Sequence, residues 1–188
     1  MRMRRIQHLV NDMAVHKILT PDEPLLRKKA KKVRLFDAGL KALADDMVET
    51  MLAANGIGLA ANQIGVLQRM IVVQLPEEYE EPEAGKLFVV VNPEIVEASQ
   101  ELVAGEEGCL SVPGFAGEVC RPAKITLKGQ TLKGRPIRLS AEGLLARVFQ
   151  HECDHLDGIL FIDRVEEPEK LRRLTSSEES AERVLPAE

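Results

Sequence analysis

Apolar side chains recur every three or four residues in two stretches of the chain, and a period of about 3.6 residues predicts amphipathic helices. The first stretch covers residues 40–52 and ends before an Asn-Gly pair, which commonly stops a helix. The second covers residues 141–156, begins after Ser140 and ends near Gly158. Apolar residues lie on two sides of this second helix, so we expect it to be buried.

Short runs rich in β-branched residues predict strands between the two helices. They are RMIVVQL (69–75), KLFVVVNP (86–93), EIVEAS (94–99), KITLKG (124–129) and PIRLS (136–140). The segment GIGLAANQIG (56–65) is typical of a glycine-rich loop, and PEEYEEPEAG (76–85) of an acidic surface loop. The order of helix, strands and helix predicts an α+β fold with a central second helix.

The sequence divides into three parts. Met13 begins a segment that resembles a natural start, so residues 1–12 are interpreted as an extension that the fold does not need. Residues 13–165 are expected to form one domain. Residues 166–188 are highly charged; EKLRRL (169–174) predicts a short helix, and the rest is expected to be partly disordered.

Composition excludes several classes of protein. The net charge of −5 and the absence of tryptophan argue against a dedicated nucleic-acid-binding protein. No apolar run approaches the roughly 20 residues that span a bilayer, so no membrane association is expected. Three cysteines are too few, and odd in number, for a disulfide framework. A reducing cytoplasm is the simplest location.

The sequence QHECDHLDG (150–158) places two histidines on one face of the second helix. His151 and His155 are about 40° apart, because each helical residue advances by about 100°. They continue an apolar stripe with Leu144 and Val148, so two imidazoles can reach one metal ion inside the protein. Glu152 is offset by one position and can act as a general base without binding the metal.

A catalytic site of this kind needs a third protein ligand and one open position. No histidine follows His155, and the downstream carboxylates lie in no ligand motif. Upstream, Cys109 lies in GEEGCLSVPG (105–114), where glycines let the backbone approach a ligand closely. Cys153 is about 200° from His151 on the helix and is expected to pack in the core. Cys120 has no comparable setting.

Other readings of these residues remain open at this point. The motif could belong to a metalloendopeptidase with a third ligand downstream. Cys109 could be the nucleophile of a cysteine hydrolase, which would act without metal. The chain could also be a non-catalytic metal-binding protein, or the histidines could be exposed on a charged helix.

Three motifs taken together indicate the protein family more specifically than the histidine motif alone. GIGLAANQIG, EGCLSVPG and QHECDHLDG, in this order and spacing, resemble the signature motifs of peptide deformylases, and the likeness covers roughly residues 14–165. The resemblance implies an α+β fold with short mixed or antiparallel sheets around a central metal-binding helix. It implies removal of the N-formyl group from the initiator methionine of new bacterial or organellar polypeptides, with release of formate.

The resemblance also implies a role for each motif residue at the reacting centre. Cys109, His151 and His155 would bind one divalent ion, usually Fe²⁺, although Zn²⁺, Ni²⁺ or Co²⁺ can occupy such sites. Glu152 would transfer protons. The side chain of Gln63 and the backbone N–H of Leu110 would stabilise the formyl oxygen as negative charge develops on it.

Substrate binding is implied for a second group of residues. The backbone near Ile57, Gly58 and Gly108 would pair with the formylmethionyl nascent peptide as an added strand. Leu144 and Val148 would line a slot for the methionine side chain. Many bacterial members of the family carry an arginine shortly after the turn EGCLS (107–111), whereas this chain has residues 115–117 (Phe-Ala-Gly) there. For the C-terminal segment the resemblance implies only a transient ribosome contact.

Overall fold

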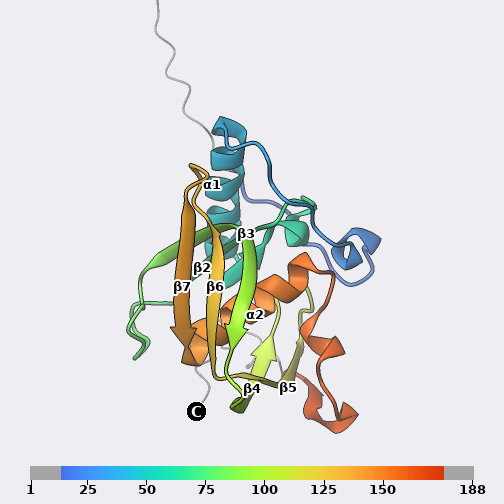
Figure 1. Ribbon diagram of the computed structural model, residues 1–188. Coiled ribbons are helices and arrows are strands. Elements are labelled where there is room, and N and C mark those ends of the chain that lie inside the picture. The colour runs from blue at the N-terminus through green and yellow to red at the C-terminus, as the bar shows by residue number, and fades with distance from the viewer. Residues whose placement is uncertain (1–13, 176–188) are drawn as a thin grey trace, which may run out of the picture.

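The computed structural model describes residues 14–175, which form two helices and eight strands with four short 3₁₀ turns (Figure 1). The helices are α1 (Ala38–Ala53) and α2 (Gly143–Leu156). The strands are β1 (Gly58–Ala60), β2 (Met70–Gln74), β3 (Leu87–Ala98), β4 (Leu102–Gly108), β5 (Phe115–Pro122), β6 (Lys124–Gln130), β7 (Pro136–Glu142) and β8 (Leu171–Arg173). The 3₁₀ turns are η1 (Pro24–Arg27), η2 (Ala61–Ile64), η3 (Phe161–Asp163) and η4 (Pro168–Lys170).

The strands form two antiparallel sheets. The larger has the order β1-β2-β3-β6-β7, and the smaller has the order β4-β5-β8. The predicted α+β fold is therefore confirmed. Every pairing between named strands is antiparallel, and within residues 14–175 the one parallel contact is an isolated bridge between Lys31 and Gln68. No helix among residues 14–175 is both long and apolar enough to span a membrane.

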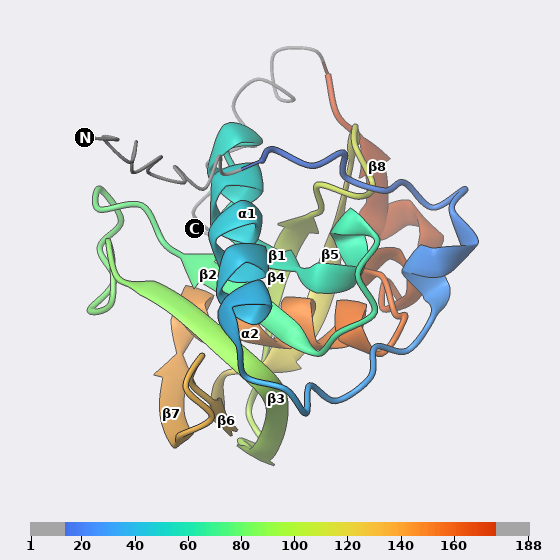
Figure 2. The same cartoon turned by 90° about the horizontal axis from the view of Figure 1, so that it is seen from above.

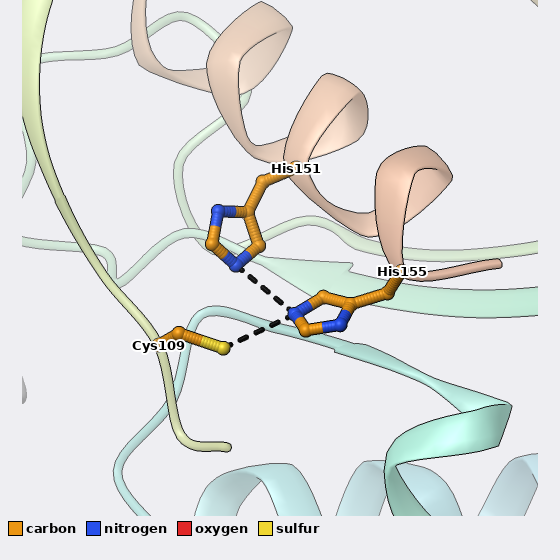
Figure 3. A group of neighbouring side chains, drawn as sticks. All are labelled: Cys109, His151 and His155. Carbon is orange, nitrogen blue, oxygen red and sulfur yellow. Dashed lines mark hydrogen bonds between the residues drawn. The ribbon is translucent and has the colours of Figure 1, made fainter. Parts of the chain in front are cut away.

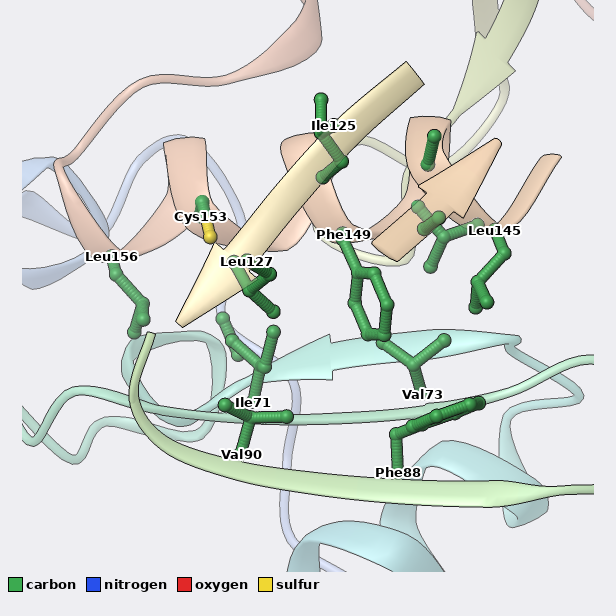
Figure 4. Packing of buried hydrophobic residues seen from close by; sticks show 14 of the residues in the cluster. Ile71, Val73, Phe88, Val90, Ile125, Leu127, Leu145, Phe149, Cys153 and Leu156 are labelled. Carbon is green, nitrogen blue, oxygen red and sulfur yellow. The ribbon is translucent and has the colours of Figure 1, made fainter. Parts of the chain in front are cut away.

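Helix α2 lies at the centre of the molecule, as its two apolar sides predict (Figures 1 and 2). One side packs on the larger sheet, where Phe149 meets Phe88 edge-to-face with ring centroids 5.4 Å apart (Figure 4). Cys153 joins this cluster and is 7% exposed, which confirms its predicted packing role. The opposite side of α2 faces the smaller sheet, so the residues on that side lie between the two sheets.

Helix α1 covers the other face of the larger sheet and forms a second cluster of buried apolar residues. Its first turn is capped by Asp37, whose carboxylate accepts a hydrogen bond of 3.0 Å from Leu40 N–H. Met47 and Met51, both fully buried, come from the predicted apolar stripe. Residues 40–52 therefore form a helix as expected.

Two local predictions were wrong. Residues 86–93 and 94–99 form one strand, β3, because Asn92 takes a positive φ of 53° and a register shift around Pro93 lets the strand continue. Ser140 lies within β7 and does not begin the second helix. The N-cap of α2 is Glu142, and the capping carboxylate comes from Glu81, which accepts from Leu144 N–H at 3.1 Å.

The region after residue 165 also differs from the expectation. The segment 169–174 was predicted to be a helix, but Pro168–Lys170 forms a 3₁₀ turn and Leu171–Arg173 forms β8. Strand β8 pairs with β5 and extends the smaller sheet. Its residue Leu171 packs against a third apolar cluster, which contains Phe161. The predicted N-terminal extension 1–12 and the tail 176–188 lie outside the described residues.

Candidate active site

The site is formed where three segments far apart in the sequence meet. Cys109 lies at the tip of the β4–β5 hairpin, in a turn closed by Val112 N–H donating to the Cys109 carbonyl at 2.8 Å. His151 and His155 project from α2 toward this turn (Figure 3). Gln63 lies in η2, directly after β1. The three sequence motifs therefore converge on one place.

The thiol and the two imidazoles lie close enough to share one ion. The Sγ atom of Cys109 is 3.1 Å from Nε2 of His155, and that nitrogen is 3.2 Å from Nε2 of His151. All three donor atoms lie within 4.8 Å of one another (Figure 3). One sulfur and two imidazole nitrogens form a donor set that suits zinc and related divalent ions. These residues therefore fit a metal site with one open coordination position.

The electrostatics favour a neutral imidazole at His155. Burial and the neighbouring His151 lower the pKa of His155 well below its usual value. A neutral imidazole is the form that binds a metal ion. At His151 burial opposes the charged form, but contacts with Cys109 and Glu107 outweigh it and raise the pKa of this imidazole. The charged form of His151 carries a proton on Nε2, and a metal ion bound at this nitrogen would replace that proton.

Glu107 fixes the orientation of His151. Its Oε2 lies 2.9 Å from His151 Nδ1, which leaves Nε2 directed toward Cys109 and His155. Two arginines hold this carboxylate in turn: Arg121 binds both oxygens, at 2.6 and 2.8 Å, and Arg147 binds one at 2.8 Å. Burial opposes ionisation of Glu107, but its bond to Arg121 and the contact with His151 lower its pKa below the usual range. Glu107 is therefore a negatively charged support for a metal ligand.

The network continues along α2 to Asp154, which lies about 60° from His151 around the helix. Asp154 accepts a hydrogen bond of 2.8 Å from Arg121 and is also paired with Arg164. Glu107 and Asp154 thus both hold Arg121, whose side chain is only 4% exposed. Sequence reasoning did not identify Glu107, Arg121, Arg147 or Asp154 as parts of the site. The one indication in the sequence was that Glu107 precedes Cys109 by two positions, because side chains two residues apart in a strand point to the same face.

Replacing Glu107 by glutamine should weaken both the metal site and the fold. Changes in partners of metal ligands typically cost 10–100-fold in metal affinity or activity. The change also removes the Glu107 carboxylate from two buried arginines, of which Arg121 still has Asp154 as a partner, and a broken buried pair costs about 3–5 kcal/mol. Metal titration and thermal unfolding would measure both effects. Glu118→Gln, at an exposed carboxylate on β5, is the matched control, and equal behaviour of the two variants would contradict this role.

Glu152 lies beside the three donor atoms without joining them, as its helix position predicts. It is 4% exposed, and its Oε2 has no hydrogen-bond partner among the described residues. Burial raises the pKa of Glu152 to about 7. A buried carboxylate with one free oxygen and a pKa near neutrality can both accept and release a proton.

Gln63 is held with its amide nitrogen toward the thiol. Its Oε1 accepts a hydrogen bond of 2.7 Å from Ala60 N–H, which directs Nε2 toward Ser111 Oγ at 3.2 Å and Cys109 Sγ at 3.8 Å. The preceding residue, Asn62, donates to the carbonyl of His155 at 2.5 Å. The first motif is therefore tied to both other motifs, and Ser111 and Asn62 are contacts that the sequence analysis missed.

A cleft of about 440 Å³ opens above these groups. The predicted site residues that line it are Ile57, Gly58, Gln63, Gly108, Cys109, Leu110, Leu144, Val148, His151 and Glu152. His155 lies behind them and is fully buried. Gly58 is required for this close packing, because a Cβ there would lie 2.4 Å from Glu152 Oε1 and 2.9 Å from Val148 Cγ1.

The fold and the site together define a class of protein, an α+β protein with a Cys-His-His metal site and an adjacent carboxylate. A family model described as polypeptide deformylase matches residues 15–171. The chain therefore belongs to the polypeptide deformylase family.

Individual relatives agree with this assignment. A peptide deformylase of Thermomicrobium roseum is 51% identical over 168 residues, which cover 89% of this chain and 95% of that protein. One from Natranaerobius thermophilus is 50% identical over 155 residues, covering 82% and 95%. The crystal structure of peptide deformylase from Thermotoga maritima has a TM-score of 0.75 at 41% identity, covering 82% of this chain and 99% of that one. The Met-Ala-Ser-bound structure of the Acinetobacter baumannii enzyme has a TM-score of 0.75 at 40% identity, covering 80% and 99%.

Proposed function

We propose that this protein is a metal-dependent hydrolase that removes the formyl group from the N-terminal formylmethionine of new polypeptides and releases formate. The observation that carries the proposal is the convergence of Cys109, His151 and His155 beside Glu152, whose Oε2 has no hydrogen-bond partner within residues 14–175. Family membership supports the reaction type. The relative with Met-Ala-Ser bound, which corresponds to a deformylated product, supports the substrate class.

Cys109, His151 and His155 would hold one divalent ion, for which we propose Fe²⁺, with Zn²⁺, Ni²⁺ or Co²⁺ as substitutes. Such an ion supplies Lewis acidity, which polarises a carbonyl oxygen and makes a coordinated water more acidic. The protein determines where that chemistry occurs. Glu107 orients His151, and the His155 imidazole stays neutral inside the core.

Glu152 moves the proton in this scheme. Its carboxylate accepts a proton from the water that attacks the formyl carbon. The C–N bond of the formamide then breaks, and Glu152 delivers the proton to the departing methionine nitrogen. The products are formate and a free amino terminus. The pKa of about 7 suits both halves of this transfer near neutral pH.

Gln63 and Leu110 are placed to stabilise the developing oxyanion. The bond from Ala60 N–H fixes the Gln63 amide, so its NH₂ group is directed toward the cleft around Cys109. Leu110 follows Cys109 in the same turn and lines the cleft. One donor of this kind is typically worth about 10²–10³-fold in kcat.

The peptide would lie between two backbone segments on opposite sides of the cleft. Ile57 and Gly58 form one side, and Gly108, at the end of β4, forms the other. Strand β4 is at the edge of its sheet, so its free side can accept an added strand. Leu144 and Val148 line the cleft from α2 and would contact the methionine side chain.

The decisive experiment is formate release from formyl-Met-Ala-Ser, with and without a chelator. We expect release by the metal-loaded protein, loss on chelation, and restoration best by Fe²⁺, Ni²⁺ or Co²⁺. Metal analysis of anaerobically purified protein identifies the resident ion. Full activity of metal-free protein would refute the proposal.

The alternative of a metalloendopeptidase is not favoured. That interpretation requires a third ligand downstream of His155, whereas the third donor beside the histidines is Cys109, upstream on the β4–β5 turn. For the location we propose the cytoplasm of a bacterium, where formylated nascent chains leave the ribosome. A transient ribosome contact would follow from that substrate.

A further inference from the structure

The charged residues that line the cleft are not equally accessible to a substrate. The side chains of Glu107, His151 and Arg147 are 4%, 11% and 10% exposed, and Glu152 is 4% exposed. The side chain of Glu106 is 40% exposed, and it lines the same cleft. Among the charged lining residues, Glu106 is therefore the one that can face a substrate side chain in solvent.

The negative charge of Glu106 is countered by a residue from the C-terminal part of the fold. Arg172 on β8 binds both oxygens of the Glu106 carboxylate, through Nε at 2.9 Å and Nη2 at 2.9 Å. A paired, two-point contact of this type fixes both groups more firmly than a single ion pair does. The Glu106 carboxylate at the cleft is therefore countered by a positive charge and is not free.

Strand β8 is held where it can supply this arginine. Arg172 stands opposite Ala116 in the β5–β8 pairing, and Leu174 N–H donates to the carbonyl of Gly114 at 2.9 Å. Gly114 itself lines the cleft. Residues 171–174 therefore run beside β5 and reach Gly114, at the end of the turn that carries Cys109.

We propose that the Arg172–Glu106 pair sets the charge preference of the enzyme for the residues that follow formylmethionine. The inference rests on the proposed deformylase function. With both partners present, lysine and glutamate at the second or third peptide position should be accepted about equally. Removing Arg172 should leave the charge of Glu106 uncompensated, and removing Glu106 should leave the charge of Arg172 less compensated. Each change should bias the cleft toward peptides of the charge opposite to that of the remaining partner.

The test compares kcat/KM for amidated formyl-Met-Lys-Ser, formyl-Met-Glu-Ser, formyl-Met-Ala-Lys and formyl-Met-Ala-Glu at low ionic strength. Arg172→Gln should raise the Lys/Glu ratio about three- to tenfold, since each exposed charge interaction is worth a small factor. Glu106→Gln should lower the ratio by a similar factor. The double variant should return to the wild-type ratio, and salt should weaken both shifts.

Two further variants separate charge from structure. Arg172→Lys keeps the positive charge and should keep the wild-type ratio, even if the packing of β8 loosens. Arg138→Gln breaks an exposed pair with Glu97 that does not line the cleft, and it should leave the ratio unchanged. Equal losses for all peptides, or single variants that leave the ratio at its wild-type value, would overturn the proposal.

Failure of the proposed function can be recognised separately. A wild-type protein that releases no formate from any of these peptides would refute deformylation. The charge preference would then be measured by calorimetric binding of Met-Lys-Ser and Met-Glu-Ser, which needs no turnover. Opposite shifts in affinity for the two single variants would still support the role of the pair, and identical affinities would exclude it.

Discussion

Replacing Glu152 by glutamine should lower kcat for formyl-Met-Ala-Ser by about 10²–10⁴-fold while the metal stays bound. The amide keeps the size of the side chain but cannot accept the proton of the attacking water. The metal should remain because Glu152 is not among the three converging donors. The change should not destabilise the fold, because a neutral amide replaces a buried carboxylate whose Oε2 has no partner among the described residues.

The matched control is Glu142→Gln, the same change on an exposed carboxylate at the N-cap of the same helix. Steady-state kinetics, metal analysis and thermal unfolding of both variants would separate catalysis from structure. We expect the Glu152 variant to be at least as stable as the wild type and nearly inactive. A kcat close to that of the wild type would remove Glu152 from the mechanism.

The two histidine ligands could be predicted from the sequence because helical geometry determines how they lie relative to each other. A spacing of four residues places His151 and His155 on one face, whatever the rest of the fold does. Cys109 was recognised from its glycine-rich surroundings and from the family resemblance. Its distance from the histidines depends on how the β4–β5 hairpin lies against α2, which no local pattern encodes.

The hairpin itself was missed for a physical reason. Strands are recognised by apolar residues at alternate positions, but the inward positions of β4 and β5 include Glu107 and Arg121. These buried charged residues support His151, so they occupy inward positions at which a strand usually has apolar residues. Gly105, also on β4, lacks a side chain because a Cβ would lie 2.8 Å from the Arg147 guanidinium. The strands nearest the metal site are thus the least strand-like in sequence.

The start of α2 shows a second limit of local reasoning. Ser140 is a common N-cap residue, and it directly precedes the predicted helix. The structure places it in β7 and supplies the cap from Glu81, on the acidic loop between β2 and β3. A capping group that comes from 63 residues away cannot be read from the sequence next to the helix.

The metal ligand and nucleophile interpretations of Cys109 can be separated by replacing it with aspartate. Aspartate cannot form a thioester, but it can bind a divalent ion through a hard oxygen. We expect the variant to retain some metal, to favour harder ions, and to keep weak hydrolysis that a chelator abolishes.

Activity of this variant should fall by more than about 100-fold, because even partners of metal ligands are worth 10–100-fold. The thiol also contacts Ser111 N–H at 3.4 Å and the Gln63 amide at 3.8 Å, and a carboxylate would alter both contacts. Cys120→Asp is the control, since Cys120 is exposed and lies on β5 outside the cleft. It should match the wild type in metal content and rate.

Mass spectrometry of the wild-type protein during turnover completes the test. Direct attack by water forms no covalent intermediate, so the mass of the chain should not change. A cysteine nucleophile would instead carry a formyl group on Cys109 as a thioester, and Cys109→Asp would then be inactive with any metal. Trapping that thioester would replace the metallohydrolase mechanism by covalent catalysis, whereas chelator-sensitive activity of the aspartate variant would establish Cys109 as a ligand.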